Sequence, residues 1–256
     1  MALSAGTAAQ TTPAQDPRRV LIFDQGGIVR GDTSAKRMAL VFTGGSFADG
    51  GDHIRAVLRK KGVQAGFFFT GDFYRTPGFE ALIRGLVSDG HYLGPHSDRH
   101  LLYCDWTERG KTLVTRDEFR EDLLANYREM ERFGVAKDRS PYFIPPYEWY
   151  NADIVRWSRE MGLVLFNFTP GTSSNADYTT PSMKEYLSTE VIYGRILDYE
   201  KKDPRGFNGF ILLIHIGTDP ERTDKLYLRL EELITGLERR GYSFARIDDL
   251  LGAARK

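Results

Sequence analysis

Short apolar runs alternate with longer amphipathic segments through most of the chain, and this alternation constrains the fold more than any other feature. The apolar runs are strand-length and are bounded by glycine, proline or polar residues, which is typical of buried strands. Predicted strands cover residues 38–42, 66–70, 91–94, 141–144, 163–168, 210–215 and 242–246. Repeated strand-helix units form parallel sheets with right-handed crossovers. The pattern therefore predicts an α/β fold.

The intervening segments carry helix signals. Predicted helices cover residues 54–61, 77–88, 115–133, 151–161, 188–201 and 224–240. Thr115 stands three residues before Glu118, which predicts a capping box, and Asn151 is a predicted N-cap. Before the first long strand, two apolar stretches around the turn Asp24-Gln25-Gly26-Gly27 predict a β-hairpin over residues 20–30.

The chain of 256 residues fits one large α/β domain. We expect residues 1–17, which are rich in Ala, Thr and Gln, to be a disordered lead-in without the apolar centre of a signal peptide, and residues 18–256 to form a single domain. No apolar run reaches the length of a membrane-spanning helix. The single cysteine, Cys104, excludes an internal disulfide, and we interpret it as a packing thiol.

The balance of charges limits the kinds of partner that the chain is expected to bind. Lys and Arg together number 35, equal to Asp and Glu at 35, so no net charge favours nucleic acid or an anionic membrane. We expect a small or neutral partner. The oligomeric state is left open by the sequence.

Two histidines stand four residues apart in the segment from Gly94 to His100. If the backbone turned helical after Pro95, His96 and His100 would share one helix face and could hold a divalent metal ion. The alternative is a pair of surface residues at a helix end. A further histidine, His215, ends the apolar run 210–215, where barrel enzymes place catalytic groups. Its alternative is a neutral core residue that only satisfies hydrogen bonds.

With these pieces placed, residues 31–251 resemble the polysaccharide deacetylases, the NodB-homology domain of carbohydrate esterase family 4. The run His96-Ser97-Asp98-Arg99-His100 matches the family's second motif, His-(Ser/Thr)-x-x-His. Residues 143–147 are similar to its third motif, and Leu213-Ile214-His215 matches its fifth, Leu-x-His. The resemblance implies an incomplete (β/α)7 barrel in which a divalent metal, usually zinc, helps to hydrolyse acetyl groups on a glycan. It also implies a periplasmic or extracellular location, where such glycans occur.

The departures from the family pattern fall on the chemistry. The first motif is normally Thr-Phe-Asp-Asp-Gly, with a general base followed by a metal ligand, but here the run reads Val41-Phe42-Thr43-Gly44-Gly45. The third motif normally has an arginine where Ile144 stands. Our preferred hypothesis is that Asp49, further along the same glycine-rich loop, replaces a missing carboxylate as third metal ligand or as base. The alternative role of Asp49 is an N-cap, and Glu148 and Asp98 are weaker substitutes.

The resemblance then implies a set of roles. His96, His100 and Asp49 would bind one zinc ion, His215 would protonate the leaving group, and the backbone N–H of Tyr147 would stabilise the oxyanion. Asp177 is a candidate to orient His215. The expected substrate contacts come from Trp106, Pro146, Tyr147, Trp149 and Asp177. Competing interpretations are a glycan-binding protein without hydrolytic activity and a metal hydrolase acting on another amide or ester.

Overall fold

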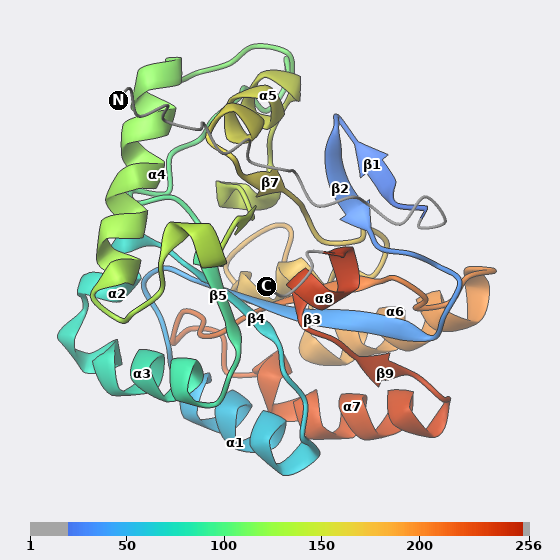
Figure 1. Cartoon of the computed structure of the whole chain (residues 1–256). Coiled ribbons are helices and arrows are strands. Elements are labelled where there is room, and N and C mark those ends of the chain that lie inside the picture. Colours follow the sequence, from blue (N-terminus) through green and yellow to red (C-terminus); the bar gives the residue numbers. More distant parts are fainter. Residues whose placement is uncertain (1–19, 253–256) are drawn as a thin grey trace, which may run out of the picture.

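The computed structural model describes residues 20–252, and the predicted lead-in at residues 1–17 lies outside them. A parallel sheet runs through the molecule in the order β5-β4-β3-β8, and the start of β3 also pairs with β9. These strands are β3 (Arg37–Gly44), β4 (Gly66–Phe69), β5 (Tyr92–Pro95), β8 (Ile211–His215) and β9 (Ser243–Phe244). Figure 1 shows β3, β4, β5 and β9 of this sheet. The predicted parallel α/β fold is confirmed.

A shorter strand pair and an isolated bridge extend the sheet toward a barrel. Strands β6 (Tyr142–Phe143) and β7 (Val164–Leu165) pair in parallel, and β6 lies against β5. An isolated parallel bridge joins Phe166, just after β7, to Ile28 of the N-terminal hairpin. The result is an incomplete (β/α)7 barrel of the NodB type, as expected.

The predicted hairpin is confirmed as β1 (Ile22–Asp24) and β2 (Gly27–Arg30). Its two turn residues, Gln25 and Gly26, have φ values of 45° and 86°, as a two-residue hairpin turn requires. The backbone N–H of Asn167 donates to the carbonyl of Ile28 at 2.7 Å. The hairpin therefore packs on the barrel wall.

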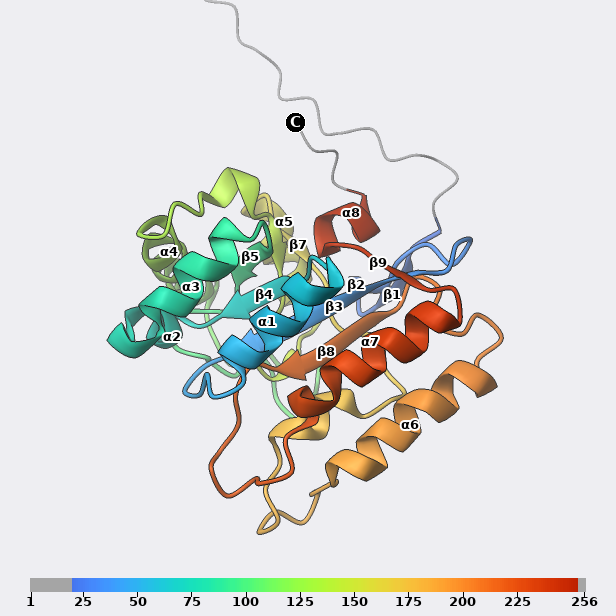
Figure 2. The same cartoon turned by 90° about the horizontal axis from the view of Figure 1, so that it is seen from below.

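Helices cover the outside of the sheet, and α1 packs beside α7 (Figure 2). The α-helices are α1 (Gly51–Lys61), α2 (Gly71–Arg75), α3 (Glu80–Ser88), α4 (Arg116–Glu131), α5 (Ala152–Glu160), α6 (Thr189–Lys202), α7 (Leu230–Arg239) and α8 (Ile247–Leu251). Short 3-10 helices include η3 (Pro146–Glu148) and η4 (Ser174–Tyr178). Within residues 20–252, no helix is both long and apolar enough to cross a membrane.

Strand β3 is apolar throughout because both of its faces are buried. Leu40 and Phe42 belong to the core beneath the outer helices, whereas Ala39 and Val41 face the barrel interior with Phe68. A strand buried on both sides reads as a continuous apolar run rather than an alternating one. Cys104 is buried and free, in agreement with a packing role.

Parallel register places the strand ends that matter at one edge. Thr43 of β3 lies opposite His215 of β8, and Gly44 lies opposite Phe69 of β4. Phe69 in turn lies opposite Pro95 of β5. The segments that begin at Gly44, Thr70 and His96 therefore leave the sheet beside His215.

The capping box at Thr115 should stabilise the start of α4. The Thr115 side chain accepts from the Glu118 backbone N–H at 3.2 Å, and the Glu118 carboxylate accepts from the Thr115 N–H at 2.7 Å. Thr115→Ala should lower the free energy of unfolding by about 0.5–2 kcal/mol in a urea titration. Thr235→Ala, within α7, is the control. Equal effects of the two substitutions would argue against the cap.

Candidate active site

His96 and His100 lie together, but not on a helix. Residues between β5 and Cys104 form an irregular loop, so the expected helical turn after Pro95 is wrong. Ser97 and His100 instead adopt left-handed backbone conformations, with φ values of 74° and 54°. The two imidazole centroids lie 5.0 Å apart. Two unusual backbone turns thus bring the rings together.

Hydrogen bonds fix the chemical state of His96. Its Nδ1 lies 2.9 Å from the carbonyl oxygen of Ile144, which can only accept, so Nδ1 carries the proton and Nε2 has a free lone pair. Burial, with some contribution from His100, holds the pKa of His96 well below its usual range. Burial also lowers the pKa of His100 to about 4. Both rings are therefore neutral at pH 7 and able to act as acceptors.

His215 is held by Asp177, a fully buried carboxylate in η4. One carboxylate oxygen lies 2.6 Å from His215 Nδ1, and the other accepts from the His215 backbone N–H at 2.9 Å. Burial alone would lower the pKa of His215, but Asp177, by charge and hydrogen bond, raises it above its ordinary value. Asp177 therefore orients His215, and it is too buried to contact a glycan as we had also expected.

Asp49 does not join the histidines. Its carboxylate accepts from the Thr218 backbone N–H at 2.8 Å and from the Tyr227 hydroxyl at 2.6 Å, and it lies 3.0 Å from Lys225 Nζ. Burial would raise the pKa of Asp49, but these three partners together lower it. Asp49 is not an N-cap either, because Gly50 precedes α1 without a side-chain cap. The structure thus gives it neither expected role.

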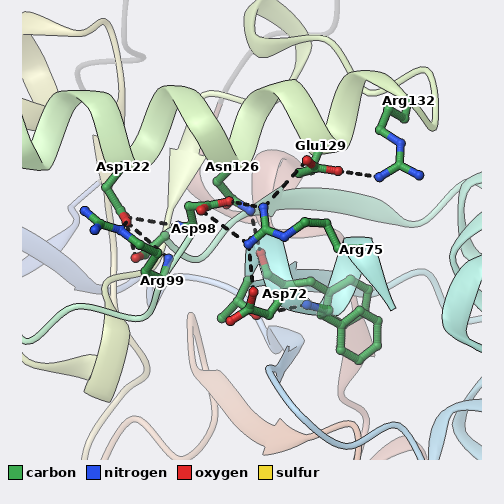
Figure 3. A network of polar contacts seen from close by, with 12 residues as sticks. Asp72, Arg75, Asp98, Arg99, Asp122, Asn126, Glu129 and Arg132 are labelled. Atoms are coloured by element: carbon green, nitrogen blue, oxygen red, sulfur yellow. Dashed lines mark hydrogen bonds and ion pairs between the residues drawn. The ribbon is translucent and has the colours of Figure 1, made fainter. Parts of the chain in front are cut away.

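Asp98 is likewise engaged elsewhere. Its carboxylate lies 2.6 Å from the Arg75 guanidinium, which also binds Asp72 (Figure 3). A carboxylate paired in this way is not free to serve the neighbouring histidines.

The position of the usual third metal ligand is closed by packing. A Cβ atom on Gly44 would lie 2.7 Å from Ile216 Cγ2 and 3.0 Å from ring atoms of Phe69 and Phe73. Within residues 20–252, no group of three or more His, Cys, Asp or Glu side chains could hold a metal ion. A zinc centre with three protein ligands therefore does not fit the described residues.

Thr43 occupies the position of the usual base. Its hydroxyl is buried and has no hydrogen-bond partner within the described part of the chain. A threonine hydroxyl cannot take a proton from water at neutral pH as a carboxylate can. Thr43, His96, His100 and His215 all line one cavity of about 370 Å³. Asp49 lines a neighbouring cavity of about 620 Å³, which shares Ser46, Phe47 and Thr218 with it.

Aromatic side chains extend the site beyond His100. The Tyr147 ring centroid lies 4.3 Å from that of His100, and Trp106 lies edge-on to Tyr147 at 5.6 Å. Trp106 also stacks on Trp149 at 5.8 Å. Trp106 and Tyr147 are 57% and 45% exposed, so they present an apolar surface to solvent, whereas Pro146 is buried and takes no part in that surface.

Glu148, named only as a weak substitute from the sequence, has an unusual environment. Tyr147 and Glu148 both have left-handed backbones, with φ values of 58° and 51°, and strained residues of this kind gather at functional sites. Asn167 Nδ2 donates to the Glu148 carbonyl at 2.7 Å and holds the turn. Burial raises the pKa of the Glu148 carboxyl to about 7; Asp177 adds to the rise and His215 opposes it.

The closed niche at Gly44 predicts a stability difference between adjacent glycines. Gly44→Ala should lower the free energy of unfolding by about 1–3 kcal/mol, because the added methyl group overpacks a filled space. Gly45→Ala is the matched control, since its Cβ would meet nothing closer than 3.8 Å. Thermal or urea unfolding of both variants measures the difference. A neutral Gly44→Ala would mean that a side chain fits there.

The Asp177 contact predicts the protonation of His215. In Asp177→Asn, burial would act without the compensating charge, and the pKa of His215 should fall below the ordinary value of about 6.5. An NMR titration of the ring measures it. Asp219→Asn removes another carboxylate that lines the cavity and should leave the His215 pKa unchanged. An unaltered pKa in Asp177→Asn would contradict the assigned role.

Known proteins place these features in a family. Residues 30–166 match the family model described as polysaccharide deacetylase. The chain is 24% identical over 222 residues to the Bacillus subtilis peptidoglycan-N-acetylmuramic acid deacetylase PdaA, covering 86% of this chain and 73% of that protein.

Solved structures agree in fold. A CE4 family pseudoenzyme from Bacillus anthracis superposes with a TM-score of 0.69 at 20% identity, covering 91% of this chain and 72% of that one. The chitin deacetylase from the fungus Colletotrichum lindemuthianum gives a TM-score of 0.68 at 20% identity, covering 91% and 94%. The resemblance found in the sequence motifs is confirmed, and the chain belongs to the polysaccharide deacetylase family.

Proposed function

We propose that this protein binds an acetylated glycan at the cavity lined by His96, His100 and His215 and hydrolyses an acetyl amide or ester there. The observation that carries the proposal is the pairing of His215 with Asp177. The buried carboxylate accepts from both the backbone and the ring of one histidine, which fixes the ring and favours its protonated form. A site that only binds sugar does not require a histidine prepared to donate a proton.

His215 is the proposed acid and Glu148 the proposed base. The Glu148 carboxyl, with a pKa of about 7, can take a proton from water at neutral pH. The water oxygen bonds to the acetyl carbon, and the Tyr147 backbone N–H donates to the oxyanion. The carbon–nitrogen or carbon–oxygen bond then breaks, and His215 Nε2 gives its proton to the leaving amine or alkoxide. The products are acetate and the deacetylated sugar.

The metal ion implied by the family resemblance has only part of its ligand set here. His96 Nε2 and a nitrogen of His100 would be its protein ligands, and such an ion would polarise the acetyl carbonyl. Catalytic zinc sites normally have three protein ligands. Because a third is missing among residues 20–252, no step of the proposal passes through the metal.

The substrate class follows from the relatives and from the aromatic surface. PdaA is named for peptidoglycan N-acetylmuramic acid and the fungal enzyme for chitin, both N-acetylated glycans. The exposed faces of Trp106 and Tyr147 suit stacking against sugar rings beside the cavity. A glycan of this kind implies a periplasmic or extracellular location.

A second function, glycan binding without hydrolysis, is favoured by the first motif. Thr43 and Gly44 replace both of its carboxylates, and the space at Gly44 is filled. The Bacillus anthracis neighbour is described as a pseudoenzyme, and a mutant of it as having restored enzymatic activity.

Acetate release from acetylated chitin, xylan and peptidoglycan fragments separates the two functions. The wild type should release acetate, and His215→Ala and Glu148→Gln should each lower kcat by about 100- to 10,000-fold, as loss of an acid or a base does. The pH profile of the rate should be bell-shaped, because activity needs Glu148, whose pKa is about 7, without its proton and His215, whose pKa is raised, with its proton. Glu121→Gln, on the exposed side of α4, is the control.

Measurements with and without chelator would show whether a metal contributes. Binding of the fragments without acetate release, weakened by Trp106→Ala, would support the binding function. Unchanged turnover in Glu148→Gln would remove Glu148 from the mechanism.

A further inference from the structure

Asp122 of α4 places a buried carboxylate beside residues 96–100 (the histidine loop), next to Asp98 and Arg99 (Figure 3). Its side chain is completely buried. The carboxylate accepts four hydrogen bonds, all from the loop: from Ser97 Oγ at 2.5 Å, Asp98 N at 3.0 Å, Arg99 N at 3.1 Å and Arg99 Nε at 3.3 Å. A buried charge is costly unless it is compensated in this way.

The contacts of Asp122 act on the strained part of the loop. Ser97 has a φ of 74° and His100 a φ of 54°, in the left-handed region that non-glycine residues seldom adopt. The three residues that bind Asp122 are the three that separate His96 from His100. Most of this binding is through main-chain and hydroxyl groups, since the Arg99 side chain is 61% exposed and its ion pair adds little.

One turn further along α4, Asn126 continues the same support. Its Oδ1 accepts from the His96 backbone N–H at 3.0 Å, and its Nδ2 donates to the Phe69 carbonyl at 3.2 Å. Glu129, on the next turn of this face, binds Arg75 and Arg132 and has no hydrogen bond to the histidines (Figure 3). One helix face therefore contacts both His96, through Asn126, and the three residues that follow it, through Asp122.

We propose that Asp122 is a positioning residue that sets the spacing and orientation of His96 and His100 by holding residues 97–99, the turn that begins at the left-handed Ser97. The inference deepens the proposed function, because these two rings line the cavity in which the acetyl group would react. The competing role is stability alone, in which the loop keeps its conformation when the carboxylate is altered.

Asp122→Asn tests the proposal with little change in size. The carboxylate accepts hydrogen bonds through both of its oxygens, whereas the amide of asparagine has one acceptor oxygen and one NH₂ donor. The NH₂ group would therefore face a donor of the loop and lose that hydrogen bond. NMR of ring nitrogens and Cε1 protons reads the result directly. The variant should shift the signals of His96 and His100 and mix the tautomers of His96, and leave those of His215 unchanged.

Ser97→Gly provides the rescue. Glycine adopts a positive φ without strain, so Asp122→Asn combined with Ser97→Gly should return the His96 and His100 signals toward their wild-type positions. Glu129→Gln is the matched control on the same helix face and should leave all three histidines unchanged. If Asp122→Asn fails to fold, Ser97→Ala removes only the hydroxyl donor and should give a smaller shift of the same two histidines.

The two possible roles of Asp122, positioning of the histidines and stability alone, predict different results. Wild-type histidine spectra in a folded but destabilised Asp122→Asn protein, or in Ser97→Ala where that is the variant measured, would overturn the proposal. Where acetate release is detected, kcat should fall at least tenfold in Asp122→Asn with little change in KM, since small misplacements of reacting groups are costly. The NMR result does not need hydrolysis, so failure of the proposed function would leave this test intact.

Discussion

The parallel register of four strands is the constraint on which the site depends. With Thr43 opposite His215, Gly44 opposite Phe69 and Phe69 opposite Pro95, the loops after β3, β4 and β5 leave the sheet next to the end of β8. Groups far apart in sequence therefore line one cavity, because the sheet itself brings the ends of their strands together. The same register makes the first motif decisive, because residues 43 and 44 stand at the centre of that edge.

Two buried carboxylates then organise the histidines that the sheet brings together. Asp177 fixes His215 through its ring and backbone, and Asp122 binds the three residues between His96 and His100. The Asp177 carboxylate accepts two hydrogen bonds and the Asp122 carboxylate accepts four, as burial of a carboxylate requires. His96 and His100 are neutral and can accept, whereas the pKa of His215 is raised and its ring can donate a proton. One cavity therefore holds both acceptor and donor groups. The loss of motif-one carboxylates leaves this arrangement in place.

Sequence patterns predicted β3, β4, β5 and β8 well because these strands are apolar runs that are buried almost throughout. They predicted the caps at Thr115 and Asn151 because those depend on local spacing. They missed α2, which is too short to show a helical period. Asp49 was misplaced because distance along a loop does not reveal which way a side chain points, and Tyr227 and Lys225, its partners, lie far away in sequence. The sequence did not single out Asp122 for a similar reason. Helix α4 contains many charged residues, and nothing in the sequence distinguishes the buried Asp122 from the exposed acids.

With Thr43 and Gly44 in place of both motif-one carboxylates, the histidine site lacks a complete three-ligand metal centre among residues 20–252. Elemental analysis of the purified wild-type protein, dialysed after addition of zinc, tests it most directly. We expect clearly less than one zinc ion per chain after dialysis, because two histidines alone hold the ion weakly. One ion per chain retained through dialysis, and lost in His96→Ala, would contradict an incomplete centre and show that a third ligand completes it.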